Sequence, residues 1–251
     1  DLHIEAHSFP TRRSSDLQSG DWSLLPARFD AVVYAASTGG GGPEAYALAY
    51  DVGVKRALAW AQVVGAQSFI FTSSTGVYRQ DDGGVVDETS PVGGAPTADA
   101  ILGGERAVLA SGFAKARVLR FGGLYGPGRH HLVDQLRRGD NVIGGRVDHF
   151  INYLHRDDAA SSILAAIVAG PVGARVYNVG DGNPVTKEAL AKWIAKRLGV
   201  AEPIFDPSAP AGPRVAKGGR TQPNRIVATG LIRAELAWNA RFPDVFAGLT
   251  E

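Results

Sequence analysis

Two short stretches of the chain join an apolar run to small and hydroxyl-bearing residues, a pattern that can bind a polar ligand. They are FIFTSSTGVY, from Phe69 to Tyr78, and VLRFGGLYGPGR, from Val118 to Arg129. Each begins as an apolar strand and changes to Ser, Thr or Gly where the strand should end. In an open parallel sheet, the carboxyl ends of the strands form the edge at which ligands bind. Small side chains there let a ligand approach the backbone, and Ser73, Ser74 and Thr75 supply hydroxyl groups for hydrogen bonds.

These stretches belong to a regular alternation of expected strands and helices. Phe29 to Ala36 is an apolar run, typical of a strand buried on both faces. Further strands are expected from residue 69, at 116–121 and at 176–179, and helices at 43–65, 97–109, 157–169 and 186–199. Strands that alternate with helices predict right-handed crossovers and a parallel sheet, so the expected fold class is α/β. The Pro- and Gly-rich segment 206–224 is expected to be a surface loop.

The composition excludes several classes of function. The chain of 251 residues carries a net charge of +1, and its Lys and Arg residues are scattered, so we expect no nucleic-acid partner. The absence of Cys excludes disulfides, thiolate metal sites and a Cys nucleophile, and we expect no metal site. No apolar run approaches transmembrane length, so we expect no membrane association and a cytoplasmic location.

The first residues of the chain are interpreted as non-native. The sequence contains no Met, and Ser8 to Leu17 reads, codon by codon, like a translated sequencing adapter. We therefore expect native protein to begin near Gln18, after a non-native tail at 1–17. The alternative is a polar, disordered tail, which the Ser and Arg content would also allow.

The two stretches resemble the fifth and sixth strands of the extended short-chain dehydrogenases/reductases, in the NAD-dependent epimerase/dehydratase group. The resemblance continues through VYNVGDGNPVT (Val176 to Thr186) and the segment that begins with NRI at Asn224. It implies a doubly wound parallel Rossmann-type sheet that lacks its first strands, with a smaller C-terminal substrate lobe. The implied domains are a partial dinucleotide-binding domain at 18–125 and a substrate-binding lobe at 126–251. Strands and helices near 150–180 would return from that lobe to the sheet.

A glycine run after the first expected strand has two interpretations. Gly39 to Gly42 lies between a strand and a helix, as the phosphate turn of a Rossmann fold does. The fingerprint spacing, however, would place Ala45 at the third glycine and Pro43 inside the turn. The next strand also ends in serines rather than in the acid that holds a ribose. We therefore match Phe29 to Ala36 with the fourth strand of the family, and expect the fingerprint turn in a missing N-terminal segment.

The resemblance implies that NAD or NADP binds at the carboxyl edge of the sheet. The residues that choose between the two dinucleotides should lie in the missing segment. The backbone that follows the sixth strand would flank the nicotinamide. The expected cofactor contacts are Ala35, Ala36, Ser37, Thr72, Ser73, Phe121, Gly122, Gly123 and Leu124.

The catalytic residues of the family are a Ser or Thr, a Tyr and a Lys. The Lys lowers the pKa of the Tyr, so that the phenol can exchange a proton with the substrate. Ser74 matches the Ser/Thr position. If Glu105 matches the Glu that follows the Lys, then Thr97 occupies the Tyr position and Ile101, which is inert, occupies the Lys position. The chain thus lacks the usual acid/base pair and resembles the atypical branch of the family, whose members also lack it.

Other residues near the expected edge have alternative interpretations. Tyr78 could replace the missing Tyr, but a phenol that packs beside the site is the commoner case. Tyr125 and Arg129 are candidate substrate contacts, and Arg129 could hold an anionic group or be an exposed loop residue. His130 and His131 are expected in a solvated loop rather than as metal ligands.

Two acidic pairs are expected to have structural roles. Asp157 and Asp158 are expected to cap a helix. Asp87 and Glu88 are expected to line a loop.

Two functions of different classes fit these residues. The first is an NAD(P)-dependent oxidoreductase or epimerase that acts on a small hydroxylated or carbonyl substrate, for example a nucleotide sugar, with Ser74 bonded to the substrate. The alternative is a non-catalytic dinucleotide-binding or redox-sensing protein, for which loss of the Tyr and Lys costs nothing. A homodimer through the helix at Tyr50 to Val64 is a further candidate. An unpaired apolar edge on the Phe29 strand would favour association and poor solubility.

Overall fold

A parallel β-sheet forms the centre of the protein in the computed structural model, which describes residues 28–38, 42–210 and 223–250. The strand order is β1-β2-β4-β9, and all three neighbouring pairs are parallel. The strands are β1 (Ala31–Tyr34), β2 (Ser68–Ser74), β4 (Lys115–Phe121) and β9 (Gly173–Val179). Each lies at or within two residues of an expected strand, except that β1 is shorter and β9 begins earlier. The expected α/β class is confirmed.

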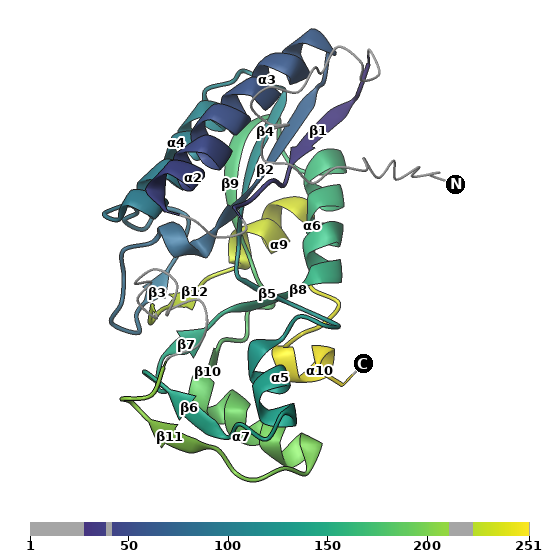
Figure 1. The fold of residues 1–251 in the computed structure, drawn as a ribbon. Coiled ribbons are helices and arrows are strands. Elements are labelled where there is room, and N and C mark those ends of the chain that lie inside the picture. The colour runs from purple at the N-terminus through teal and green to yellow at the C-terminus, as the bar shows by residue number, and fades with distance from the viewer. Residues whose placement is uncertain (1–27, 39–41, 211–222, 251) are drawn as a thin grey trace.

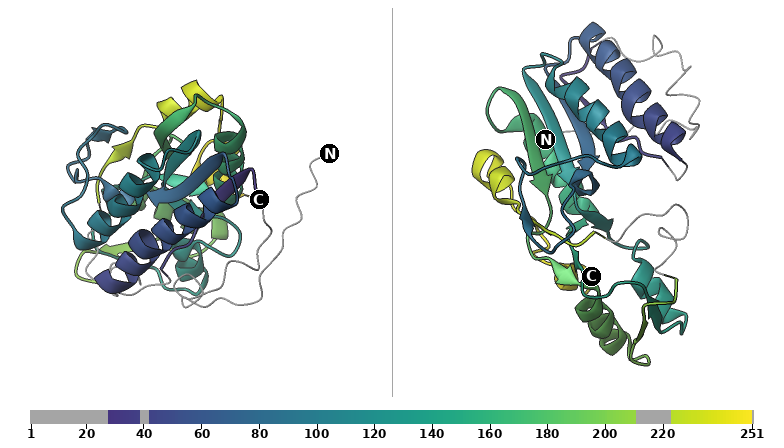
Figure 2. Two further views of the ribbon diagram at one scale, coloured as in Figure 1. Left: turned by 90° about the horizontal axis from the view of Figure 1, so that it is seen from above. Right: turned by 90° about the vertical axis from the view of Figure 1, so that its left-hand side faces the viewer.

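Helices cover both faces of this sheet, so the fold is doubly wound (Figures 1 and 2). One face is covered by α2 (Pro43–Ala47), a π-helical segment (Leu48–Val52), α3 (Gly53–Val63) and α4 (Pro96–Leu109). The other face is covered by α6 (Arg156–Val168) and α9 (Gly230–Leu236). Strand β2 shows why both faces are needed, because Phe69 and Phe71 pack on the α4 side while Ile70 packs on the α6 side.

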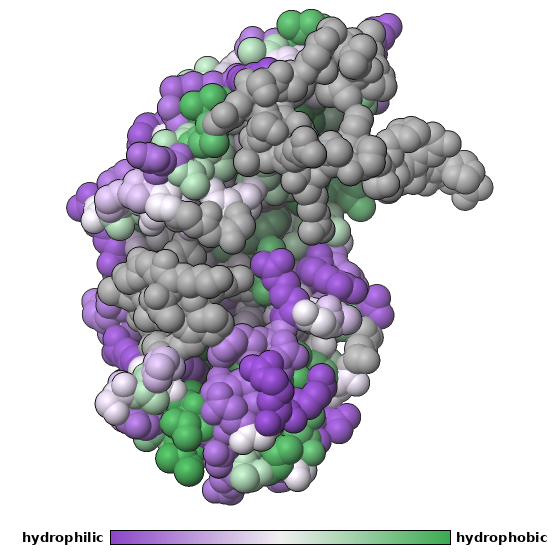
Figure 3. All heavy atoms as spheres, in the orientation of Figure 1, coloured by the Kyte–Doolittle hydropathy of each residue, from purple (hydrophilic) through white to green (hydrophobic). Residues whose placement is uncertain are grey.

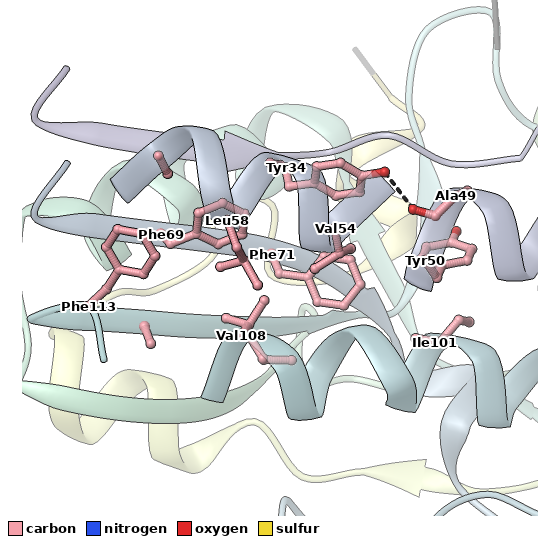
Figure 4. Packing of buried hydrophobic residues seen from close by; sticks show 14 of the residues in the cluster. Tyr34, Ala49, Tyr50, Val54, Leu58, Phe69, Phe71, Ile101, Val108 and Phe113 are labelled. Carbon is pink, nitrogen blue, oxygen red and sulfur yellow. Dashed lines mark hydrogen bonds between the residues drawn. The ribbon is translucent and has the colours of Figure 1, made fainter. Parts of the chain in front are cut away.

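The core on the α4 side is rich in aromatic residues (Figure 4). The Tyr34 hydroxyl donates a hydrogen bond to the carbonyl of Ala49 at 2.5 Å, which ties β1 to the π-helical segment. Gly104 on α4 lies so close to that segment that a Cβ would come within 2.4 Å of the Tyr50 carbonyl oxygen. Only glycine allows this approach of two helices.

The expected dimer surface at Tyr50 to Val64 is corrected by this packing. Its apolar residues Tyr50, Val54 and Leu58 are buried in the core, together with Ala57 and Ala61. The apolar side of the helix is therefore turned toward the sheet and α4. It is not available to a second subunit.

A second, smaller lobe lies at the other end of the molecule (Figure 1). It is built on short ladders and on two helices that pack against each other, α5 and α7. Its elements are β5 (Gly123–Tyr125), α5 (His131–Arg137), β6 (Val142–Gly144), β7 (Phe150–Ile151), β8 (Tyr153–His155), β10 (Val185–Thr186), α7 (Lys187–Leu198), β11 (Ile204–Asp206) and α10 (Val245–Gly248). The ladder of β3 (Val85–Val86) with β12 (Ile226–Val227) connects the loop after β2 to the C-terminal region.

The ends of α7 follow the sequence signals. Thr186 caps the helix by accepting a hydrogen bond from the Ala189 N–H at 3.2 Å, and Gly199 ends it with φ of 66°. The two residues are the first and last of the helix range expected at 186–199.

The surface carries few large apolar side chains in the part of the chain that the structure describes. Figure 3 shows one apolar patch at the end of the smaller lobe, where β6 and β11 lie. Val142 and Ile204, which face each other across these two strands, are both exposed. No described helix is long and apolar enough to cross a bilayer. The proposed tail at 1–17, Gly39 to Gly41 and residues 211–222 of the expected loop lie outside the described residues.

Candidate functional site

The carboxyl ends of β2 and β4 lie side by side, as the two sequence stretches predict. Ser74 is opposite Phe121 in the ladder, and the Thr75 hydroxyl donates to the Phe121 carbonyl at 3.3 Å. Gly122 continues the contact on the far side, where its N–H donates to the Val179 carbonyl at 2.9 Å. Three strand ends therefore form one edge, at which a ligand can reach the backbone.

The end of β1 adds small, accessible residues to this edge. Ala35 and Ser37 are exposed and Ala36 is half-buried. Thr72 ties this strand end to β2, because its hydroxyl lies 3.5 Å from the Tyr34 carbonyl oxygen. The arrangement leaves backbone at the end of β1 open to an incoming ligand.

The glycines after β4 are required by a close backbone approach. A Cβ at Gly122 would lie 2.7 Å from the Asn152 carbonyl oxygen, so any larger residue would push the two chains apart. The N–H of Gly123 donates to that same oxygen at 2.7 Å, and Gly123 itself is exposed. Leu124 is half-buried against the core on the α6 side.

Ser73 and Ser74 have different environments although they are neighbours. The Ser74 Oγ accepts the Gly76 N–H at 3.1 Å, which leaves its own hydroxyl hydrogen available, and the residue is only half-buried. Ser73 is buried, and its hydroxyl donates to the Glu105 carboxylate at 2.5 Å. Of the two expected serines, Ser74 can bind a ligand through its hydroxyl, whereas the hydroxyl of Ser73 is already bonded to a buried carboxylate.

A row of polar side chains crosses the sheet beneath this edge. Ser73, Arg120 and Asn178 are direct neighbours in register on β2, β4 and β9. Glu105 of α4 neutralises the row, because its two carboxylate oxygens accept hydrogen bonds from the Arg120 guanidinium at 2.7 and 3.0 Å. The ion pair is nearly inaccessible to solvent, with side-chain exposures of 6% for Arg120 and 3% for Glu105.

Tyr78 belongs to the same buried network. Its hydroxyl donates to the Asn178 side chain at 2.6 Å and accepts from Arg120 at 3.0 Å, and the Arg120 guanidinium lies 5.0 Å from the ring centre. Burial raises the pKa of the phenol, although Arg120 acts in the opposite direction. Only 3% of Tyr78 is exposed. This environment favours the packing interpretation over a catalytic phenol.

Helix α4 presents no acid/base pair at the positions where the family has Tyr and Lys. Ile101 is 3% exposed and points into the apolar cluster of Figure 4. Thr97 is half-buried in the first turn of the helix. The geometry therefore offers no replacement at these two positions.

Tyr125 and Arg129, the candidate substrate contacts, lie in contrasting environments. Tyr125 is only 1% exposed, and its hydroxyl donates to the Asp244 carbonyl at 3.2 Å. Burial raises the pKa of that phenol above its usual range. Arg129 is exposed at the start of the smaller lobe, so it alone of the two can meet a solvent-borne group.

The histidine expectation is corrected for His130. Its side chain is buried, and its Nδ1 accepts the Val133 N–H at 3.4 Å, so it caps α5. Burial lowers the pKa of His130 to about 4, which keeps the ring neutral near pH 7. His131, in contrast, is exposed.

The capping role expected for Asp157 and Asp158 is also corrected. Helix α6 is capped by His155, whose Nδ1 accepts the Asp157 N–H at 3.3 Å. Asp158 is buried and accepts the N–H groups of Arg241 and Phe242 at 2.8 and 3.0 Å. It therefore holds the C-terminal segment rather than the helix end. Among the described residues, no three of His, Asp and Glu come together to hold a metal ion.

Comparisons with known proteins agree with this architecture. No family model matches the chain. Protein YeeZ of Escherichia coli strain K12 is 29% identical over 88% of this chain and 74% of its own length. A 3-diazoavenalumate denitrifying reductase of a Streptomyces species is 29% identical over 75% of this chain and 66% of its own length.

A solved structure extends the likeness to the whole architecture. It is the UDP-glucuronic acid 4-epimerase of Bacillus cereus in complex with NAD, which superposes with a TM-score of 0.76 at 20% identity. The match covers 93% of this chain and 76% of the epimerase. This is the fold of the NAD-dependent epimerases and dehydratases. The resemblance derived from the sequence is thereby confirmed for the fold.

The sequence interpretation missed the roles of Arg120 and Asn178. Arg120 is a charge inside the apolar run VLRF of β4, and a buried charge requires a partner. The buried charge predicts that a partner exists but not which residue it is. Glu105 lies on α4, and only the crossover connection brings this helix next to the strand that carries Arg120.

Proposed function

We propose that this chain is an NAD(P)-dependent oxidoreductase or epimerase that acts on a small hydroxylated or carbonyl substrate. The observation that carries the proposal is the edge at which β1, β2 and β4 end together in small, accessible residues. Glycine at 122 lets backbone approach backbone there, and the exposed Ala35 and Ser37 leave room beside it. These features fit the flat rings and ribose of a dinucleotide, which must come close to the backbone and need no charged side chain there.

The residues of the edge would have different roles in binding the dinucleotide and the substrate. Bound NAD or NADP would exchange a hydride with the substrate carbon. The half-buried Ser74 would donate its free hydroxyl hydrogen to the substrate oxygen and so orient it. The backbone from Gly122 to Leu124 would flank the nicotinamide, while Thr72 and Phe121 would shape the floor of the site. Arg129 would hold an anionic group of the substrate at the junction of the lobes.

The substrate class is supported by two comparisons that point in different directions. The Bacillus cereus structure is an epimerase of a nucleotide sugar, and the Streptomyces relative is named as a reductase. The epimerase is named for a sugar, which bears hydroxyl groups, and this name supports the hydroxylated substrate class. We propose that the smaller lobe, approximately residues 126–251 without the strands that return to the sheet, selects the substrate.

A specific observation favours a second candidate, a dinucleotide-binding protein without catalysis. Ile101 is buried in the core and Tyr78 is held by Arg120 and Asn178. Neither position supplies a group that can exchange a proton with a substrate. A redox sensor would bind the dinucleotide at the same edge and would need no such group.

Titration and turnover measurements separate the two candidates. With the expected fingerprint turn restored upstream of this chain, we expect the protein to quench or shift the fluorescence of NADH or NADPH on binding, and to oxidise the bound form with a member of a carbonyl panel. The S74A variant should lose at least about tenfold in turnover, while S111A, at the far end of α4, should not. Tight binding without turnover would favour the sensor. No binding of either dinucleotide would contradict both.

A further inference from the structure

A buried ammonium group in the smaller lobe has no countercharge among the residues that the structure describes. Lys187 is the first residue of α7 and is only 7% exposed. Its Nζ donates one hydrogen bond, to the Gly144 carbonyl at 2.7 Å, although an ammonium has three hydrogens to donate. Burial lowers the pKa of Lys187, and no carboxylate among the described residues acts against that shift. A neutral carbonyl does not require a charged partner, so this bond alone does not explain a lysine here.

The position of Lys187 on its helix makes the charge less favourable still. The N-terminal end of a helix carries a partial positive charge from its unpaired N–H groups. A cation at the first position of the 12-residue α7 is therefore opposed by the helix as well as by burial. Only a negative charge nearby would relieve both effects at once.

Two histidines interact with Lys187. The Lys187 N–H donates to the His149 carbonyl at 3.3 Å, next to the antiparallel ladder that pairs β10 with β7. His149 is 5% exposed, and its Nδ1 has no hydrogen-bond partner in the described part of the chain. His131, at the first turn of α5, also lies within the electrostatic reach of Lys187. Burial lowers the pKa of both histidines, and the charge of Lys187 adds to the effect.

The carboxylates of this region are already committed or act elsewhere. Asp148, next to His149, accepts a hydrogen bond from Arg146 at 2.8 Å and is exposed to solvent. Asp134 and Asp140 act on His131 but not on Lys187. Among the described residues, the buried ammonium thus has only the neutral Gly144 carbonyl as an acceptor, and the Nδ1 of His149 has no hydrogen-bond partner.

We propose that Lys187, His149 and His131 form a binding site for an oxyanion, the carboxylate or phosphate group of a ligand. The ligand would accept hydrogen bonds from the two free Lys187 hydrogens, and a proton taken up by His149 Nδ1 would supply a third donor. His149 directly precedes β7, and His131 and Lys187 begin α5 and α7; all three elements lie in the smaller lobe (Figure 1). The site does not depend on the proposed dinucleotide edge, because none of its residues lies on β1, β2 or β4.

Thermal unfolding with inorganic phosphate tests the site. At saturating phosphate and constant ionic strength, we expect the Tm of the full chain to rise by about 2–4 °C over chloride. The K187M variant should lose this rise and bind phosphate at least about tenfold more weakly. Without phosphate, K187M should unfold at the same or a higher Tm, because an uncompensated buried charge has been removed. K192M, on the exposed side of the same helix, should behave as the wild type.

A purely structural lysine would give a different pattern. K187M would then lower the Tm without phosphate, and phosphate would raise the Tm of variant and wild type alike; either result overturns the proposal. Histidine NMR spectra of the wild-type chain provide a test that needs no variant. Phosphate should shift the ring signals of His149 and His131 but not those of His155, which packs on Phe242. Unmoved His149 signals at millimolar phosphate would overturn the proposal as well.

Two further experiments identify the anion and keep the test of this site separate from the test of the proposed function. Acetate in place of phosphate distinguishes a carboxylate site from a phosphate site, and stabilisation by either supports the oxyanion proposal. Titration of K187M with NADH should give the wild-type result. Loss of dinucleotide binding in the wild type would therefore contradict the proposed function and leave the oxyanion result standing.

Discussion

Arg120 places a full positive charge inside the central sheet, and one residue, Glu105, neutralises it. Removing one partner of a buried ion pair leaves the other charged and desolvated, which costs about 3–5 kcal/mol. We therefore expect E105Q to lower the free energy of unfolding by that amount in urea denaturation. The Asp51–Lys55 pair is the matched control, because it is exposed on the helix surface. D51N should cost less than about 0.5 kcal/mol.

The double variant E105L/R120M tests whether the cost comes from the unpaired charge. Replacing both charged residues by apolar ones of similar volume leaves no buried charge, so the loss should be much smaller than in E105Q. An equal loss in both variants would show that packing or the Tyr78 contacts dominate instead.

Asp181 is a second buried acid, and its own pKa is unusual. It is 3% exposed, and burial raises its pKa to about 7. An unfolded Asp titrates near 4, so the folded state holds the proton more strongly and the protein loses stability as the pH rises from about 4 to 7. A shift of this size corresponds to a loss of up to about 4 kcal/mol.

We expect D181N to abolish this part of the pH dependence. The amide is neutral at every pH, and its oxygen can still accept the Asn183 N–H that Asp181 now accepts at 2.8 Å. D181N should therefore be more stable than the wild type at pH 8 and similar to it at pH 4. Parallel unfolding curves of the two proteins over this range would contradict the assignment.

At the residue scale, the sequence was sufficient to predict which residues lie at the ends of the central strands. Ser74 and Gly122 were located because hydroxyl and glycine residues that end an apolar run have a local meaning. Asp158 was misjudged because its partners lie across the fold, in the chain beyond residue 240. His130 was misjudged because its ring packs against Tyr125 and Tyr153. Burial of a polar residue depends on such distant contacts, which no local spacing contains.

The C-terminal segment is an element held by a few directed bonds. Both carboxylate oxygens of Asp158 accept backbone N–H groups from it, and Asn183 donates to the Pro243 carbonyl at 2.6 Å. In D158N, the side-chain NH₂ would face a backbone N–H, and one charge-assisted bond would be lost. We expect a cost of about 1.5–3 kcal/mol and faster hydrogen exchange across 241–250.

The neighbouring acid provides the control for this prediction. Asp157 has a side chain that is 58% exposed, and D157N should leave exchange in the C-terminal segment unchanged. If D157N and D158N accelerate exchange equally, the segment is not held by Asp158.

At the element scale, long periodic segments were predictable and short ladders were not. The helices α4, α6 and α7 lie within one residue of the ranges read from apolar spacing and caps. The pairs β3–β12 and β7–β10 have two residues in each strand, too few to show any periodicity. Their pairing depends on contacts between residues far apart in the sequence.

The central sheet has two edge strands in the described part of the molecule, β1 and β9, and β1 carries an exposed apolar side chain. Among the described strands, β1 pairs with β2 alone, and Val33 is 40% exposed there. Unpaired, apolar edges favour strand-to-strand association. We expect V33K to reduce concentration-dependent association, measured by sedimentation velocity.

A second exposed valine separates the edge from general surface hydrophobicity. Val63, at the end of α3, is 84% exposed and is not part of any strand. V63K should leave the association unchanged. An equal reduction by V63K would point to ordinary apolar contacts rather than to the edge of the sheet.

The polar row of Ser73, Arg120 and Asn178 has a consequence for how the chain assembles. Strands that slide by one position exchange their two faces. A misaligned β4 would drive the guanidinium toward Ile70 and Tyr177, far from the carboxylate of α4, and that arrangement would be heavily penalised. A strand with only apolar residues on both faces could shift by one position at little cost. A strand that carries one paired charge could not, because the shift would separate the charge from its partner. The buried ion pair thus favours the correct alignment of β4 with its neighbours during folding, before any ligand is present.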